Sequence, residues 1–470
     1  MKIKERAEGC CFGIAFEKEG YAMTETPLYT ALKAHLSKNR AAFHTPGHKG
    51  RFLPADLYEM DLTELPDTDS LFEADGCIAQ AEAKAAELFH SRTTFFSAGG
   101  CTLCIQAMFC LAAPQGGKVI SSRVIHRSAV NTMALLGIKP VWVRPRPDAG
   151  PGLAGRLYPE DVKAALQENP DAKAVYVTSP DYYGVLADIR GLSQVCHEYG
   201  VPLLVDNAHG THLALLGKHP LALGADLTAC SAHKTLPVLT GGAFLNVGET
   251  ALSRRLHFAE RAKEAMALFG STSPAYPVMV SLDLARAWAM EHGKEEWERL
   301  AERMAEIKET AWKKGILLPL GETDPTRLAI GTLPLGMSGE QAAEYFREKG
   351  IEPEHEDGGY VVFITTPFHT EEELDRLEKA VMSLPDCTAS VTESLPALPA
   401  LPPVAMTPRD AVLSFQKKIP LQNAVGRIAG EAACPCPPGV PVVMPGEKIT
   451  EECARFLEQA GVYEIFVVEE

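Results

Sequence analysis

Two short stretches carry most of the information in this sequence, Val205-Asp206-Asn207-Ala208-His209-Gly210 and Ser231-Ala232-His233-Lys234-Thr235. The apolar run 201–205 ends in the acid Asp206, and the short segment 226–230 leads directly into the second stretch. Both patterns are typical of buried strands, and open α/β sheets bind ligands at the carboxyl ends of their strands. We therefore expect Asp206 and Lys234, 28 residues apart, to lie at one edge of a sheet.

A lysine amine beside a buried carboxylate suits pyridoxal 5'-phosphate (PLP). This cofactor needs a lysine for a Schiff base and a carboxylate that keeps its pyridine nitrogen protonated. A structural ion pair between Asp206 and Lys234, with a histidine at the surface, is the alternative interpretation of the same residues.

Three further segments favour the cofactor. Gly99-Gly100-Cys101-Thr102 lies between a predicted strand, 93–97, and an apolar helix, 103–111, so its backbone N–H groups and hydroxyl can hold a phosphate. His126 lies at a strand-to-helix junction, where its ring can stack on a flat cofactor, although a histidine there is more often structural. The hydroxyl-rich turn 271–276 can complete a phosphate site.

The composition excludes several classes of function. The chain of 470 residues has a formal net charge of -16 and a pI of about 5.4, which argues against nucleic acid or an anionic membrane as a partner. No apolar stretch is long and uncharged enough to span a bilayer, and no secretory signal opens the sequence. The cysteines, most of them in apolar runs, indicate reduced thiols in a cytoplasmic protein, and no metal-binding pattern is present.

Predicted strands and helices alternate along residues 93–245, which favours a mostly parallel sheet with helices on both faces. A charged amphipathic helix, 294–313, begins a different region, and the Pro-rich stretch 395–403 indicates a linker. We therefore predict four parts in order along the chain: a loosely ordered extension over 1–22, a PLP-binding large domain over 23–293, a small domain over 294–394, and the linker with a C-terminal domain over 395–470.

With Phe43-His44-Thr45-Pro46-Gly47-His48-Lys49-Gly50, these motifs resemble the ornithine/lysine/arginine decarboxylase family. The resemblance covers about residues 23–470 and fits the short form of the family, which lacks an extra N-terminal domain. It implies the aspartate-aminotransferase-like fold of PLP enzymes, fold type I. That fold is α/β, with a mostly parallel sheet sandwiched by helices, a smaller α+β domain and a C-terminal domain. The resemblance also implies a homodimer or higher homo-oligomer.

The resemblance implies a role for each residue of the site. Lys234 would form the internal aldimine, Asp206 would pair with the pyridine nitrogen, and His209 would lie near the phenolic oxygen. Ala208 and His126 would pack on the two faces of the ring. The proton returned to Cα would come from Lys234 or His233. Several residues would surround the phosphate, with one contributed by a neighbouring subunit (Thr272): Gly100, Cys101, Thr102, Ser231, His233 and Thr272. Near the subunit interface would lie His44, Pro46, His48 and Lys49.

The implied reaction is PLP-dependent decarboxylation of a basic L-amino acid, through a quinonoid, to the corresponding amine and carbon dioxide. Arginine, lysine and ornithine remain open as substrates. An aminotransferase or another PLP lyase on the same fold is an alternative, and so is a non-enzymatic binding protein.

Two groups of residues bear on the choice of substrate. Five acids are candidates for holding the substrate's distal cation, and each is alternatively a surface carboxylate: Glu64, Asp67, Asp69, Glu354 and Glu431. Departures from the family pattern leave the substrate open, and they fall in the glycine turn 99–102 and at Asn207, Asp181 and Cys436.

Overall fold

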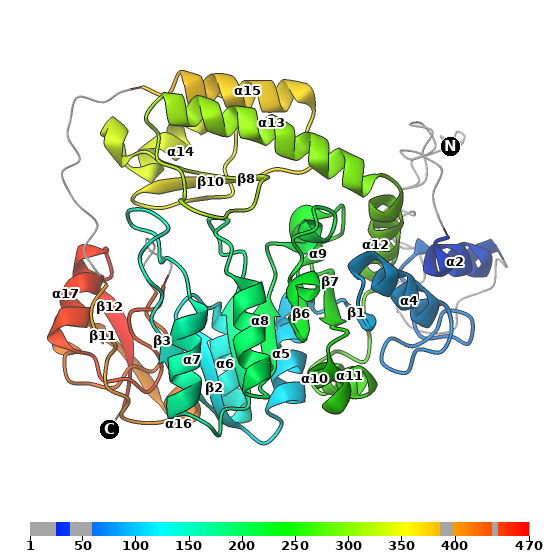
Figure 1. The fold of residues 1–470 in the computed structure, drawn as a ribbon, viewed down its shortest axis with the longest axis horizontal. Coiled ribbons are helices and arrows are strands. Elements are labelled where there is room, and N and C mark those ends of the chain that lie inside the picture. Colours follow the sequence, from blue (N-terminus) through cyan, green and yellow to red (C-terminus); the bar gives the residue numbers. More distant parts are fainter. Residues whose placement is uncertain (1–24, 38–58, 386–397, 435–439, 470) are drawn as a thin grey trace, which may run out of the picture.

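A seven-stranded sheet lies at the centre of the large domain (Figure 1). The protein is seen in a computed structural model that describes residues 25–37, 59–385, 398–434 and 440–469. The strand order is β1-β7-β6-β5-β4-β2-β3. Strands β6, β5, β4, β2 and β3 run parallel, whereas β7 is antiparallel to both of its neighbours. The strands are β1 (Thr93–Ser97), β2 (Gly117–Ser122), β3 (Ile138–Val143), β4 (Ala174–Thr178), β5 (Leu203–Asp206), β6 (Leu227–Cys230) and β7 (Ala243–Val247).

Helices cover both faces of this sheet, which explains why strands β4 to β7 are buried along almost their whole length. In β4, Ala174 and Tyr176 pack with one set of helices, α5, α6 and α11. The alternate residues Val175 and Val177 pack with the other set, α7 and α8. These helices are α5 (Gly100–Ala112), α6 (Arg127–Leu136), α7 (Pro159–Glu168), α8 (Ile189–Glu198) and α11 (Phe258–Ala267).

Local sequence signals set the ends of several of these helices. Pro159 is the first residue of α7, where its missing N–H has no helical partner to lose. The Asp188 side chain accepts the Gly191 N–H and so caps α8. Gly137 ends α6 at a φ of 67°, a left-handed conformation that glycine adopts without steric cost.

Four further helices of the large domain are α2 (Pro27–Ser37), α4 (Cys77–Phe89), α10 (Ala251–Arg255) and α12 (Tyr276–Trp288). The buried Asp283 of α12 accepts the N–H groups of Leu28 and Tyr29, and thereby fixes the start of α2. Arg286, one turn further along α12, pairs with Asp283 and donates to the Glu25 carbonyl at 2.9 Å. The first described helix is therefore tied to the body of the domain.

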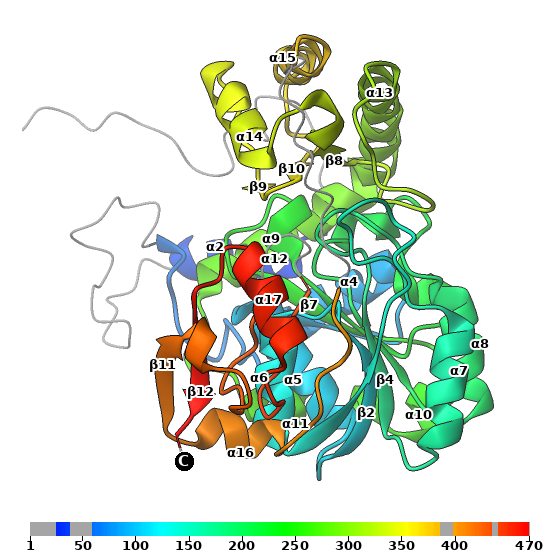
Figure 2. The ribbon, with the colours of Figure 1, turned by 90° about the vertical axis from the view of Figure 1, so that its left-hand side faces the viewer.

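The small domain lies against one end of the large domain in both views (Figures 1 and 2). Helix α12 continues through a single π turn, Ala289–Gly293, into the 20-residue helix α13 (Lys294–Lys313). A three-stranded antiparallel sheet of order β8-β10-β9 follows, with two helices that each begin with a capping box. These elements are β8 (Arg327–Gly331), α14 (Gly339–Glu348), β9 (His355–Glu356), β10 (Tyr360–Ile364) and α15 (Glu371–Met382).

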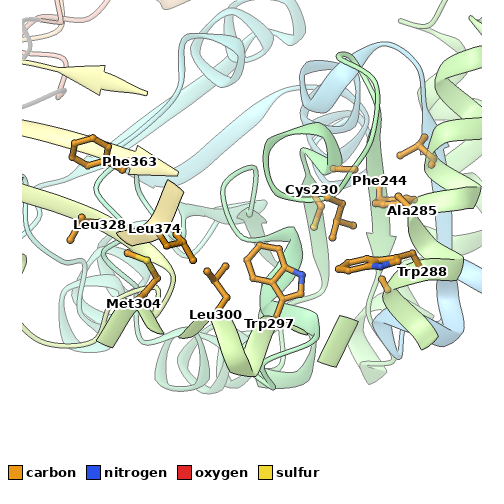
Figure 3. Close-up of a cluster of buried hydrophobic side chains, with 14 of the residues drawn as sticks. Cys230, Phe244, Ala285, Trp288, Trp297, Leu300, Met304, Leu328, Phe363 and Leu374 are labelled. Carbon is orange, nitrogen blue, oxygen red and sulfur yellow. The ribbon is translucent and has the colours of Figure 1, made fainter. Parts of the chain in front are cut away.

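One hydrophobic cluster joins the two domains (Figure 3). Trp297 of α13 is fully buried between Trp288 and Phe244 of the large domain and Leu328 and Phe363 of the small domain. Because the cluster is continuous, the small domain is held against the large domain by packing as well as by the α12–α13 connection.

The C-terminal domain has its own core and is attached to the large domain by a buried ion pair. Arg123, directly after β2, donates to Glu447 at 2.8 Å, and both side chains are 2 % exposed. Apolar residues from α17 and β12 pack around Leu421 and Val443. The elements of this domain are α16 (Pro408–Leu413), β11 (Gln416–Pro420), α17 (Glu451–Gln459) and β12 (Glu464–Val468).

The predicted fold class is confirmed: the chain is α/β, with a mostly parallel sheet between helices, a smaller domain and a C-terminal domain. The predicted helix 294–313 has the bounds of α13. Residues 231–235 contain the four-residue helix α9 (Ala232–Thr235), which carries Lys234 immediately beyond β6. The predicted extension 1–22 lies outside the described residues. Within the described ranges, no helix combines the length and the apolar character needed to cross a bilayer.

Candidate active site

Asp206 and Lys234 lie at the carboxyl edge of the central sheet. Asp206 is the last residue of β5, and Lys234 lies in α9, four residues after the end of the parallel neighbour β6. Helix α9 is at the edge of the sheet that faces the small domain (Figures 1 and 2). The two residues that the sequence singled out therefore come from adjacent strand ends.

The Asp206 carboxylate is buried and only partly satisfied by the protein. It is 2 % exposed, and it accepts the Tyr176 hydroxyl at 3.0 Å and the Ala208 N–H at 3.1 Å. Burial raises the pKa of Asp206, whereas these hydrogen bonds and the charges of His126 and Lys234 lower it. A carboxylate in this setting favours a cationic N–H group as its remaining partner.

Lys234 presents its amine beside a buried histidine. Its Nζ lies 2.8 Å from His209 Nε2. Burial lowers the pKa of Lys234, while the negative charge of Asp206 opposes this effect. The lowered pKa increases the share of uncharged amine, which is the form that attacks a carbonyl group.

His209 connects this amine to an arginine from the small domain. Arg327 is the first residue of β8, is 3 % exposed, and directs Nη1 and Nη2 at His209 Nδ1 from 3.4 and 3.5 Å. Its Nη1 also donates to the Tyr182 carbonyl at 2.9 Å. Burial, followed by the positive charges of Arg327 and Lys234, holds the pKa of His209 well below its usual value.

The glycine turn before α5 is suited to hold a phosphate. Gly100 has a φ of 70°, and open space lies where a side chain would begin. It opens a 13-residue helix that has no side-chain cap. The Gly100 N–H donates to the Gly241 carbonyl at 2.8 Å, and the N–H groups that follow it in the first turn are available to an anion. Cys101 is buried and Thr102 is exposed. Burial raises the pKa of Cys101 well above the usual thiol value, and the charge of Asp206 adds to this effect, so the sulfur remains a neutral thiol.

His126 has a structural contact within the site. Its Nδ1 accepts the Ser128 N–H at 3.2 Å and lies 2.7 Å from the Ser128 hydroxyl, so the ring caps α6. Partial burial lowers the pKa of His126. The charge of Asp206 raises this pKa, and the charge of Lys234 lowers it further. The cap fixes the ring at the junction where stacking on a cofactor was predicted.

Other predicted site residues are placed less centrally. His233 Nδ1 lies 3.1 Å from the Gly242 carbonyl and 3.4 Å from the hydroxyl of the buried Ser231, contacts that tie α9 to the chain before β7. Thr272 is exposed in the turn before α12. Four predicted interface residues lie outside the described ranges: His44, Pro46, His48 and Lys49.

The structure separates the five acidic candidates. Glu354 accepts a hydrogen bond from the Tyr182 hydroxyl at 3.0 Å. Its negative charge raises the pKa of both Lys234 and Arg327. The other four lie in different settings. Asp67 pairs with His35, Asp69 accepts N–H groups at the start of α4, Glu64 accepts the Ser70 hydroxyl, and Glu431 is exposed in the C-terminal domain.

Two departures from the family pattern have structural contacts here. Asn207 is fully buried and donates to the Gly210 carbonyl at 3.1 Å. Asp181 accepts the N–H groups of Tyr183 and Val185 and thus fixes the turn after β4, and burial raises the pKa of Asp181 to about 6. Cys436 lies outside the described residues.

Sequence reasoning missed Arg327, Tyr176 and Tyr182. The sequence did contain a signal for Arg327, since it is a charged residue directly before the apolar run 328–330. Buried charges are rare without a partner, so such a residue could have been singled out. Tyr176 lies inside an apolar strand, where a tyrosine is ordinarily a core residue.

The site combines an amine and a buried carboxylate at the carboxyl edge of a mostly parallel sheet, beside a helix N-terminus. Solved structures share this fold. A lysine decarboxylase of Francisella novicida superposes with a TM-score of 0.78 at 18% identity, covering 94% of this chain and 81% of that one. The lysine decarboxylase A of Pseudomonas aeruginosa also gives 0.78, at 19% identity, covering 94% and 80%.

Sequence comparison gives the family. The sequence models for the major domain and the C-terminal domain of Orn/Lys/Arg decarboxylases match residues 26–318 and 392–464. An arginine decarboxylase of Bacillus subtilis is 35% identical over 462 residues, which cover 92% of this chain and 93% of that protein. One of Bacillus anthracis is 32% identical, covering 93% of each. The chain therefore belongs to the Orn/Lys/Arg decarboxylase family, whose members are carboxy-lyases of basic amino acids, and family and fold together imply PLP.

Proposed function

We propose that this enzyme decarboxylates arginine to agmatine, with PLP held by Asp206 and Lys234. The juxtaposition of these two residues at one sheet edge carries the proposal. The choice of arginine is supported by relatives named arginine decarboxylase at 32% to 35% identity, against 21% and 22% for relatives named lysine decarboxylase.

The polar groups at the site fit PLP. Within the described residues no cationic N–H group donates to the Asp206 carboxylate, and a protonated pyridine nitrogen would supply one. The Lys234 amine is favoured in its uncharged form, which a Schiff base requires. The first turn of α5 offers N–H groups to a phosphate, which Gly100, Cys101, Thr102 and Ser231 would surround. When bound, PLP supplies an electron sink for the electron pair that remains on Cα as carbon dioxide leaves.

The protein's own groups prepare the site for this chemistry. Tyr176 and the Ala208 N–H hold the Asp206 carboxylate in one orientation, in which it would keep a proton on the ring nitrogen of bound PLP. Lys234 Nζ is the base that can hold a proton and return it to Cα. Ala208 and His126 would cover the two faces of the ring, and His209 lies next to Lys234.

We assign the distal guanidinium of the substrate to Glu354. This carboxylate is exposed, is held by the Tyr182 hydroxyl, and acts electrostatically on Lys234. A carboxylate binds a guanidinium through paired, charge-assisted hydrogen bonds. His355, whose ring packs edge-on against Tyr182 at 5.0 Å, helps to fix this side of the site.

The aminotransferase alternative requires an arginine that is free to hold the substrate carboxylate. Arg327 is the buried arginine beside Lys234, but its donors are directed at the Tyr182 carbonyl and at His209. This engagement by the protein supports decarboxylation over amino transfer.

Product analysis tests the proposal. Purified protein supplied with PLP is incubated with arginine, lysine or ornithine, and carbon dioxide and the matching amine are measured. We expect agmatine from arginine, and a loss of at least about 10³-fold in Lys234→Ala. The control is Lys163→Ala, which removes an exposed lysine on α7 and should retain full activity. Conversion that depends on a 2-oxo acid, or no conversion of arginine, contradicts the proposal.

We also propose a cytoplasmic homodimer or higher homo-oligomer. The exposed position of Thr272 supports a role at a neighbouring subunit's phosphate site. Light scattering after size-exclusion chromatography should give at least twice the chain mass of 50.8 kDa. A monomer that retains full activity contradicts both the assembly and the role of Thr272.

A further inference from the structure

His209 lies between two nitrogen-bearing side chains from different parts of the chain. Its Nε2 is 2.8 Å from Lys234 Nζ, and its Nδ1 is 3.4 Å from Arg327 Nη1. The imidazole comes from the turn after β5, the amine from α9 and the guanidinium from β8 of the small domain. The three groups therefore form a row that crosses the contact between the two domains.

The protonation state of the ring follows from its surroundings. His209 is 7 % exposed and faces the positive charge of Arg327, so a second proton on the ring is strongly disfavoured. A neutral imidazole has one N–H donor and one bare nitrogen that accepts. The neighbours decide which nitrogen carries the proton.

The guanidinium of Arg327 determines which nitrogen of the His209 ring carries the proton. A guanidinium is permanently charged and only donates hydrogen bonds, so the nitrogen that it faces, Nδ1, must be the acceptor. The proton then lies on Nε2 and points at Lys234 Nζ. Only an uncharged amine has a lone pair to accept it. The opposite tautomer would set the Nδ1 proton against the N–H groups of Arg327.

We infer that Arg327 is a positioning residue that fixes the His209 proton on Nε2 and, through that N–H, holds the Lys234 amine in its uncharged form. The inference deepens the proposed function and rests on it, because an uncharged Lys234 attacks the cofactor carbonyl and takes up a proton.

Other groups around Lys234 favour either its charged or its uncharged form. The charges of Asp206 and Glu354 favour an ammonium, and ionised Cys101 would do the same, whereas burial and the charge of Arg327 favour the amine. The hydrogen bond from His209 adds a directional preference that none of these charges supplies. Arg327 is held for this task by its bond to the Tyr182 carbonyl, and the Tyr182 ring packs edge-on against His209 at 4.9 Å.

The first test determines the tautomer in the wild-type protein without PLP. Histidine labelled with ¹⁵N gives separate resonances for Nδ1 and Nε2, and the His209 pair is identified by its absence from His209→Ala. We expect Nδ1 to resonate as an unprotonated acceptor and Nε2 as an N–H. A proton on Nδ1, or a doubly protonated ring at neutral pH, overturns the inference. No turnover is involved, so this failure is distinct from a failure to decarboxylate arginine.

The second test separates action through His209 from the simple charge of Arg327. Brief acetylation of the cofactor-free protein at a series of pH values, read by peptide mass spectrometry, gives the pH midpoint for reaction of Lys234. We expect Arg327→Gln to raise this midpoint by about one pH unit, because an amide can accept as well as donate and therefore no longer fixes Nδ1 as the acceptor. In the His209→Ala background, Arg327→Gln should raise the Lys234 midpoint by less than about half of the rise seen when His209 is present. An equal rise in both backgrounds, or none in the first, overturns the inference.

Arg156→Gln is the matched control. Arg156 also donates to main-chain carbonyls between the domains, those of Leu186 at 3.3 Å and Glu322 at 3.2 Å. Its loss should leave the Lys234 midpoint unchanged, and a rise as large as that of Arg327→Gln overturns the inference. The tautomer measurement needs no change at Arg327, so it decides the question even where Arg327→Gln does not fold.

Discussion

Asp206 and Asp226 are both buried aspartates of the central sheet, yet they differ in how far the protein satisfies them. Asp226 precedes β6, at the amino edge, where it accepts the Leu203 N–H at 2.8 Å, His197 Nε2 at 2.9 Å and the hydroxyls of Thr250 and Ser253. Asp206 ends β5, at the carboxyl edge, and accepts one hydroxyl and one N–H from the residues that the structure describes. A buried carboxylate saturated by its own chain serves the fold, whereas an unsaturated one can receive a ligand.

The largest expected effect comes from Asp206→Asn. An amide cannot keep a proton on the facing pyridine nitrogen, so kcat/KM for arginine should fall by about 10³-fold. The free energy of unfolding should change little or rise, because a partly satisfied buried charge is removed. Steady-state kinetics and urea unfolding measure the two quantities. Retained activity would show that Asp206 is a structural acid like Asp226.

Asp226→Asn should give the opposite pattern. The amide replaces two acceptor lone pairs with N–H groups that face existing donors, so the free energy of unfolding should fall by about 2–4 kcal/mol. The kcat per folded molecule should remain close to that of the wild type. Urea unfolding monitored by circular dichroism, combined with active-site titration, separates these outcomes. A selective loss of kcat with unchanged stability contradicts the comparison.

Glu354→Gln extends the comparison to an acid at the mouth of the site. Loss of the charge that we assign to the guanidinium should raise KM for arginine by about tenfold, with a smaller change in kcat. Glu352→Gln is the control, because that exposed acid pairs with Arg347 at 2.8 Å. Equal effects of the two substitutions on KM would remove Glu354 from the substrate site.

The smallest expected effect is a pH dependence of stability at His197. The hydrogen bond to Asp226 raises the pKa of His197, although partial burial opposes the shift. The stabilisation is therefore fully present below the unfolded value of about 6.5 and is lost as the pH rises through the folded value. The wild type should have a higher free energy of unfolding than His197→Gln. This difference should be about 0.5–1 kcal/mol larger at pH 5.5 than at pH 8.5. Urea unfolding at both pH values checks this, and a pH-independent difference contradicts it.

Much of this architecture could be predicted because its signals are local. An apolar run that ends in Asp206, and another followed by Lys234, indicate adjacent strand ends, and Gly99-Gly100 indicates the turn before α5. The sequence leaves a structural histidine as the alternative for His126, and its ring does accept the Ser128 N–H.

The remaining contacts could not be predicted because they depend on tertiary packing. Arg327 reaches His209 from a residue 118 positions away, only once the small domain covers the sheet. The choice of Glu354 over Asp69 depends on the fold as well. Both are polar positions in the sequence, but Asp69 accepts the N–H groups of Gly76 and Ile78 at the start of α4, whereas Glu354 lies beside Tyr182.

Reduction of the PLP-loaded protein with borohydride, followed by peptide mapping, tests the pairing of Lys234 with the cofactor. The structure predicts one pyridoxyl-modified lysine, at position 234, and markedly weaker retention of the cofactor in Asp206→Asn. A modification at another lysine, or none in protein that decarboxylates arginine, would contradict it.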